Sequence, residues 1–479
     1  MTKDNHLFEG FAPISKAQWH AQVIKDLKGK DFSTLRWYTD EGLVVEPYYA
    51  AEDMNSLPWQ AIQQAQRKGS SGHWLNRETI TFTDAKTTCQ AAITALSKGA
   101  DALTIDLSQA EVPAIDFARL LHGIRLTDVP VTFQTVRQST QVLEALGKIT
   151  SYQIKGSLND DPLALWMQDG LWLPDTWPQL ASLLKETQHL YGRQQAAGQA
   201  RRTEPSTNFR PLTINSHHFH QAGANAAQEL AFTLSSAVTY LDKLTEAGLS
   251  ADEIVTAMEF SVSTGTNYLM EIAKLRALRY LFNQIQVSYG MAHPIPVFIH
   301  AQTSAYYQAT LEPYTNLLRG TTEAMAAAIG GCNALTVLPF DVPAGAGSST
   351  EFSQRIARNV STILREEVYL DKVIDPSAGS YYLENLTYQL ANQAWSIFLE
   401  IETLGGLMPA FEQGWVQAAV EKSYRQQTEQ LQAGKRIMVG VNKYRNKADT
   451  ESKLPFEEPI SKAGKLPLLK KRRLATWVE

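Results

Sequence analysis

Short apolar runs alternate with helix-like segments through most of the chain. The runs are rich in β-branched and aromatic residues, and amphipathic stretches such as 222–247, 268–288 and 349–367 separate them. The eight runs cover residues 102–108, 130–135, 151–158, 211–217, 257–263, 297–302, 334–339 and 371–375. Such alternation predicts parallel strands joined by right-handed crossovers, and eight units predict an α/β fold, a (β/α)8 TIM barrel. A doubly wound open sheet is the alternative, although the glycine fingerprint Gly-x-Gly-x-x-Gly is absent.

The segments on either side of the barrel lack an evident core of their own. Residues 1–60 are predicted to form an N-terminal arm, with helical spacing of apolar residues over 18–27. Residues 61–405 would form the barrel, and residues 406–479 a C-terminal helix and an extended tail. Because the arm carries apolar residues such as Trp19 and Trp37, we expect it to pack against the barrel or a partner chain. The tail after Tyr444 carries Leu466 and Trp477, and we expect it to bind a partner chain.

Composition excludes several classes of protein. Of the 479 residues, 44% are hydrophobic and 19% are charged, which permits a large core. The formal net charge of -5 argues against a nucleic-acid surface. The N-terminus shows no signal segment, and we expect no membrane span. Only two cysteines, Cys89 and Cys332, are present, which fits a reducing, cytoplasmic location.

Polar side chains end two neighbouring runs in the stretch 297–341. His300 and Gln302 end the first run, a helix-like segment from Glu323 closes on two glycines, and Asp341 ends the second run. The carboxyl ends of barrel strands are where such folds build their sites. Ordinary capping and turn residues would give the same pattern.

Three histidines follow the fourth predicted strand. If this segment is extended, His218 and His220 share one face and His217 takes the other. No His-Glu-x-x-His motif or cysteine pair adds further ligands, so we expect no metal site. A histidine here could act as a hydrogen-bond donor or general acid, or could be purely structural.

Several long motifs resemble a known family. They are His300-Ala-Gln-Thr-Ser, the segment from Pro313 to Ala327, Asn267-Tyr-Leu-Met-Glu-Ile-Ala-Lys-Leu-Arg-Ala, Asp375-Pro-Ser-Ala-Gly-Ser-Tyr-Tyr and Val439-Gly-Val-Asn-Lys-Tyr. Together they resemble the barrel domain of methylmalonyl-CoA mutase, in the right order and over nearly the whole chain. That family consists of adenosylcobalamin-dependent isomerases that rearrange methylmalonyl-CoA to succinyl-CoA by radical chemistry.

Only some of the site residues that the resemblance implies occur in this sequence. The family's catalytic histidine falls on His218, and His300 and Gln302 match a motif at the barrel mouth. The active-site tyrosine, however, falls on Thr79, and the arginine that binds the substrate carboxylate falls on Asp169. The lower-ligand signature of the cobalamin domain, Asp-x-His-x-x-Gly, is also absent, so we expect adenosylcobalamin on a partner chain and none on this one.

These departures favour a small, catalytically degenerate subunit. The resemblance then implies a heterodimer in which a large subunit carries the acyl-CoA and cobalamin sites, and in which His218 is vestigial. The alternative is a catalytic acyl-CoA mutase chain whose cobalamin domain lies on a separate polypeptide. Large side chains along the barrel axis would favour the first interpretation, and an open tunnel would favour the second.

Overall fold

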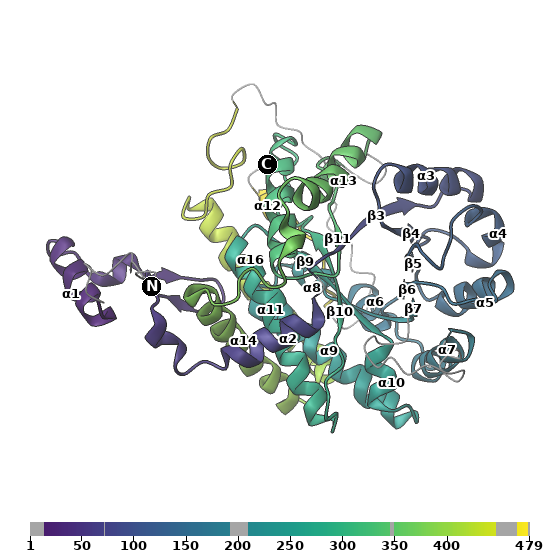
Figure 1. Ribbon diagram of the computed structural model, residues 1–479, viewed down its shortest axis with the longest axis horizontal. Helices are drawn as coiled ribbons and strands as arrows, with labels where there is room; N and C mark the ends of the chain where they lie inside the picture. The colour runs from purple at the N-terminus through teal and green to yellow at the C-terminus, as the bar shows by residue number, and fades with distance from the viewer. Residues whose placement is uncertain (1–13, 71, 192–208, 345–348, 447–466, 478–479) are drawn as a thin grey trace, which may run out of the picture.

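A closed parallel barrel forms the centre of the molecule (Figure 1). The computed structural model describes residues 14–70, 72–191, 209–344, 349–446 and 467–477. Nine parallel strands follow the order β7-β6-β5-β4-β3-β11-β10-β9-β8. The end strands β7 (Phe209–Arg210) and β8 (Leu212–Asn215) are separated only by Pro211. They are therefore two pieces of one strand, interrupted where proline lacks an N–H for the ladder, and this strand closes an eight-stranded barrel.

The predicted (β/α)8 fold is confirmed, and seven of the eight predicted strands overlap observed ones. The observed strands besides β7 and β8 are β3 (Leu75–Thr81), β4 (Ala102–Asp106), β5 (Val131–Gln134), β6 (Gly156–Asn159), β9 (Met258–Thr264), β10 (Phe298–Thr303) and β11 (Ala334–Thr336). The helices outside the arm are α2 (Trp59–Gly69), α3 (Ala85–Ser97), α4 (Phe117–Leu120), α5 (Ser139–Ile149), α6 (Pro162–Asp169), α7 (Thr176–Tyr191), α8 (His217–Ala222), α9 (Ala226–Glu246), α10 (Ala251–Thr256), α11 (Tyr268–Ser288), α12 (Thr315–Ile329), α13 (Glu351–Glu366), α14 (Tyr381–Thr403), α15 (Leu407–Glu412) and α16 (Trp415–Gln432).

The predicted strand at 371–375 is wrong. This segment contains a 3-10 turn, and Asp375 adopts φ 51°, which a strand does not allow. Its carboxylate is instead held by the buried guanidinium of Arg276 at 3.0 Å. The eighth strand of the barrel is β3, which the sequence analysis does not predict. Its buried positions include the polar residues Asn76 and Arg77, so a search for apolar runs does not detect it.

The two faces of the barrel wall differ in chemistry. Alternate residues such as Leu103, Ile105 and Phe133 belong to the core between strands and helices. Their neighbours Thr104 and Thr132 therefore point to the barrel axis. Other inward residues are Ser157, Ser261, Ser263, His300 and Thr336, so polar side chains largely replace the branched apolar ones that usually fill such barrels.

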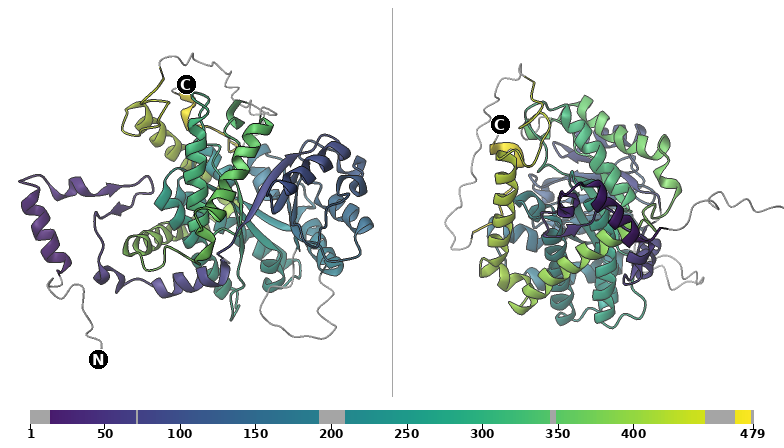
Figure 2. Two further views of the ribbon diagram at one scale, coloured as in Figure 1. Left: turned by 45° about the horizontal axis from the view of Figure 1, so that its top comes forward. Right: turned by 90° about the vertical axis from the view of Figure 1, so that its left-hand side faces the viewer.

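The N-terminal arm projects away from the barrel (Figure 2). Its helix α1 (Lys16–Asp26) buries no residue, and the side chain of Ile24 is 49% exposed. The arm is attached through the hairpin of β1 (Trp37–Tyr38) and β2 (Val44–Val45). Residues at its base, among them Leu43 and Val45, pack against helices α9, α11 and α14.

The described part of the tail, residues 467–477, packs on the chain itself. The backbone N–H groups of Leu469, Arg472 and Leu474 donate to the carbonyls of Met167, Gln221 and Tyr306. Arg472 also pairs with Glu421 of α16 at 2.7 Å. Among the described helices, none combines the length and apolar character needed to cross a membrane.

We predict that Arg276 stabilises the packing of α11 against α14. Its guanidinium is fully buried and pairs with Asp375 and Glu384, both at 3.0 Å. Arg276→Met would leave two buried carboxylates without a cation and should lower the free energy of unfolding by about 3–5 kcal/mol, measured by urea denaturation. The control Arg125→Met, which removes an exposed pair with Asp128, should cost about 0.5 kcal/mol or less. Equal losses in both variants would contradict this role.

Candidate functional site

Histidines and serines form a polar cluster inside the carboxyl-terminal half of the barrel. The ring of His217 lies between the hydroxyls of Ser263 (Nδ1, 2.7 Å) and Ser261 (Nε2, 2.8 Å). Ser261 also contacts Nδ1 of His300 at 2.9 Å, and Thr336 contacts its Nε2 at 2.8 Å. Burial lowers the pKa of His217 to about 4 and that of His300 well below its usual range. Both imidazoles are therefore neutral at physiological pH.

The structure places the three site residues predicted from the sequence as follows. His218 belongs to α8, directly after β8, and His300 and Gln302 point inward from β10. His300 joins the polar cluster, whereas the side chain of Gln302 forms no hydrogen bond with a described residue. The roles of these residues stay predictions.

His218 is enclosed and has no polar partner. Its side chain is 4% exposed, and neither ring nitrogen forms a hydrogen bond with any described residue. Burial lowers its pKa to about 3, so the ring is neutral. The predicted alternation, with His218 and His220 on one face, is wrong because the segment is helical from His217 onward.

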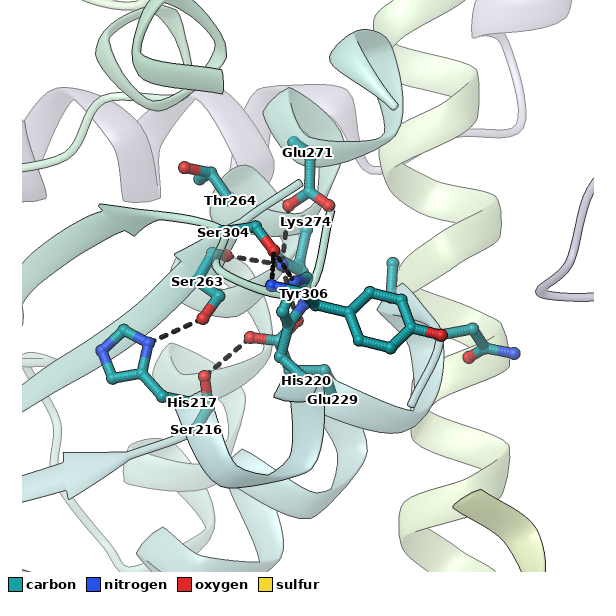
Figure 3. Close-up of polar contacts among 12 residues, drawn as sticks. Ser216, His217, His220, Glu229, Ser263, Thr264, Glu271, Lys274, Ser304 and Tyr306 are labelled. Atoms are coloured by element: carbon teal, nitrogen blue, oxygen red, sulfur yellow. Dashed lines mark hydrogen bonds and ion pairs between the residues drawn. The ribbon is translucent and has the colours of Figure 1, made fainter. Parts of the chain in front are cut away.

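A buried ion network lies behind this cluster (Figure 3). Lys274 donates to Glu229 (2.7 Å) and to the carbonyl of Ser263 (2.8 Å), and it pairs with Glu271 (2.6 Å). Burial alone would raise the pKa of Glu229, but Lys274 and His220 hold that pKa well below its usual range. The two long helices α9 and α11 are thereby fastened to each other and to β9.

His220 and Ser304 extend the network to the end of β10. Nδ1 of His220 contacts Glu229 at 3.1 Å and Nε2 contacts the Ser304 hydroxyl at 2.7 Å. The backbone N–H of Ser304 donates to Glu323 of α12 at 2.9 Å. Burial raises the pKa of Glu323 to about 8, because the N–H group of Ser304 and the charge of Arg319 offset its desolvation only in part.

Reasoning from the sequence missed the charged members of this network. Glu229, Lys274 and Glu323 all lie on otherwise buried helix faces. A charged residue in the apolar stripe of an amphipathic helix is a usable signal, since buried charges are normally paired. The sequence does not show which helix supplies the partner.

Large side chains meet near the amino-terminal end of the barrel axis. Arg77 of β3 pairs with Glu259 of β9 at 3.2 Å, and both are almost fully buried. The ring of Phe298 lies 5.7 Å from the guanidinium carbon of Arg77 and 4.3 Å from that of Arg210. Groups from four strands thus occupy this part of the axis.

A polar cavity of about 490 Å³ lies between the base of the arm, the starts of α9 and α11, and the end of α16. Its wall includes Trp37, Glu41, Tyr307 and Arg436, together with His220 of the ion network. Carboxylates, side-chain amides and aromatic rings all contribute to the lining.

The comparisons with known proteins agree with one another. The family model described as methylmalonyl-CoA mutase matches residues 113–473. The chain is 35% identical over 460 residues to the methylmalonyl-CoA mutase small subunit of Porphyromonas gingivalis, which covers 92% of this chain and 71% of that protein. It is 31% identical to the small subunit of Streptomyces virginiae, over 91% of this chain and 71% of that one. The large subunit of P. gingivalis is 36% identical over 254 residues, 53% of this chain and 34% of the relative.

We predict that Glu323 makes stability fall as the pH rises. Its pKa is about 8 in the folded chain and 4.5 in its ordinary state. The folded state therefore holds a proton that the unfolded state has lost, and stability decreases between these values by at most about 1.4 kcal/mol per pH unit. Glu323→Gln should flatten this fall. Urea denaturation at pH 5, 6.5 and 8.5 measures it, and parallel curves for both proteins would refute the assignment.

Proposed function

The chain belongs to the methylmalonyl-CoA mutase family, and on that premise we propose that it is the small subunit of a heterodimeric, adenosylcobalamin-dependent methylmalonyl-CoA mutase. In this proposal a large subunit carries the acyl-CoA and cofactor sites, and this chain is a structural partner in a cytoplasmic isomerase. The observation that carries the proposal is the similarity to two proteins named small subunits, each over more than nine tenths of this chain.

The state of the family-equivalent site residues supports a degenerate barrel. Thr79 replaces the expected tyrosine and is too short to fill the same space. His218 keeps the catalytic identity but is enclosed without a polar partner. Asp169 takes the sequence position of the expected arginine, and its carboxylate pairs with Arg137 at 2.7 Å. That pair weakens the repulsion expected between Asp169 and a substrate carboxylate, but it also engages the charge of Arg137.

The filled amino-terminal end of the barrel also supports this proposal. A CoA chain threaded along the axis would have to displace the ion pair between Arg77 and Glu259 and the stacked ring of Phe298. Separating a buried ion pair is strongly unfavourable, by about 3–5 kcal/mol. The alternative of a catalytic acyl-CoA mutase chain requires an open axis and is favoured by no contact described above.

The described residues do not fit cobalamin. A lower ligand to cobalt needs a free imidazole nitrogen, but both ring nitrogens of His220 are engaged by Glu229 and Ser304. His217 and His300 are likewise held at both nitrogens by hydroxyls. The ring nitrogens of His218 have no hydrogen-bond partner among the described residues, but this side chain is almost fully buried and does not face a surface where cobalamin could dock. We therefore place the cofactor on the large subunit.

The arm, residues 1–60, is the proposed contact with that subunit. Helix α1 has no buried residue, and the exposed side chains of Ile14, Ile24 and Tyr38 give the arm an apolar surface. A stable heterodimer should bury more than about 2,000 Å² of surface in total. A projecting arm can supply such an area without disturbing the packing of the barrel.

Removing residues 1–35 should abolish or strongly weaken the heterodimer. The deletion takes away α1 and leaves the hairpin of β1 and β2, whose base packs on the barrel, so the remaining chain should keep its melting temperature within a few degrees. Co-purification with a tagged large subunit, followed by analytical ultracentrifugation, measures the effect. Undiminished complex formation by the shortened chain would contradict the arm contact.

His218→Ala in this chain should leave turnover of methylmalonyl-CoA by the reconstituted heterodimer nearly unchanged. A proton donor without a positioned radical source starts no reaction. The equivalent histidine substitution in the large subunit should lower turnover by at least about a hundredfold, in the range of general acid–base contributions. His218→Gln is the control for packing. If either variant of this chain abolishes activity while its melting temperature is normal, the degenerate-subunit proposal fails.

A further inference from the structure

The arm surface and the polar cavity share a wall. Trp37 and Tyr38, which are 38% and 62% exposed, belong to both. A partner seated on the arm would therefore reach the cavity, which is open at the base of the arm and, at about 490 Å³, has ample room for a large side chain.

Negative charge exceeds positive charge around this cavity. Four carboxylates line it, from Asp40, Glu41, Glu229 and Glu271, against two cations, Lys435 and Arg436. Arg436 is committed to Asp40 through a short ion pair. Glu229 and Glu271 share the single cation Lys274. Lys435 is exposed and forms no ion pair with a described residue.

Glu41 is the carboxylate without a cation. Its side chain is more than nine tenths buried, and Oε1 accepts a hydrogen bond from the backbone N–H of Ala226 at 3.3 Å. Oε2 forms no hydrogen bond with any described residue. Burial raises the pKa of Glu41, which is the signature of a carboxylate that lacks a counter-charge.

We propose that this cavity is the socket for a cationic side chain, an arginine or lysine, of the partner subunit. The inference rests on the proposed heterodimer and adds the point of contact that anchors it. A guanidinium or ammonium group entering beside Tyr38 would lie near the carboxylate of Glu41 and the rings of Trp37 and Tyr307, which all line the cavity. An ion pair closed off from water and flanked by aromatic rings is the kind of contact that dominates interface affinity.

The test measures the affinity of the purified chain for the large subunit by biolayer interferometry at low and high salt. Glu41→Gln keeps the acceptor for Ala226 and removes only the charge, so it should raise the dissociation constant about tenfold or more and reduce its salt dependence. Tyr38→Ala, at an exposed position that folding does not need, should raise it several-fold. The matched control Glu144→Gln makes the same change on α5, on the opposite side of the barrel from the arm (Figure 1), and should have no effect.

The outcomes separate this inference from the proposed function. If the heterodimer forms but Glu41→Gln and Tyr38→Ala bind as the wild type does, the socket is refuted while the subunit assignment stands. If neither the wild type nor any variant binds the large subunit, the proposed function itself is wrong. Calorimetry with free L-arginine completes the test. One outcome is that the wild type binds L-arginine and Glu41→Gln abolishes this binding, while the affinity of Glu41→Gln for the large subunit stays unchanged. That result would show that the cavity is a small-molecule site and would overturn the proposal.

Discussion

The barrel depends on pairing the polar groups that its strands turn toward the axis. Apolar residues of the strands face the helices, so the axis receives hydroxyls, imidazoles and charged groups. Each such group must find a partner there, because an unpaired buried polar group is costly. His300 is held by Ser261 and Thr336, the Thr132 hydroxyl meets that of Ser157, and Arg77 meets Glu259. These contacts run between strands and fix how the barrel closes.

The same requirement extends outward into the helices and decides what the site can do. Lys274 connects α11 to Glu229 of α9 and to the backbone of β9, and His220 carries the connection on to Ser304. A network in which each member is already engaged is rigid and specific. Such a network is also poorly suited to catalysis, because a general acid or a metal ligand must be free to exchange its hydrogen-bond partner for the substrate or the metal. Rigidity of this kind suits a structural subunit.

Much of the fold could be predicted because strands with apolar outward faces leave a clear pattern. The strand β3 is not predicted because Asn76, Arg77 and Glu78 are polar. The run at 371–375 is wrongly predicted as a strand because Asp375 pairs with Arg276 and takes no part in the hydrogen bonding of the sheet. The predicted extended conformation of the histidine segment is wrong, because a short helix forms there and ends at Gly223 in a left-handed conformation. The family resemblance predicts His218 and His300 as site residues. Pairing between distant helices, as in Glu229 with Lys274, cannot be predicted from the spacing of residues along the sequence.

The balance of buried charges differs between the barrel with its helices and the base of the arm. Along the barrel axis and among the surrounding helices, Arg77, Lys274 and Arg276 each have a carboxylate partner from this chain. Such pairs stabilise the fold and leave none of these three cations free to bind an acid. At the base of the arm the balance is reversed, because Glu41 is buried without a cation and lies next to exposed aromatic rings. A buried charge that the chain does not neutralise itself is tolerated most readily where another molecule supplies the opposite charge. The base of the arm therefore differs from the barrel axis, because it holds a buried carboxylate that no described cation pairs with.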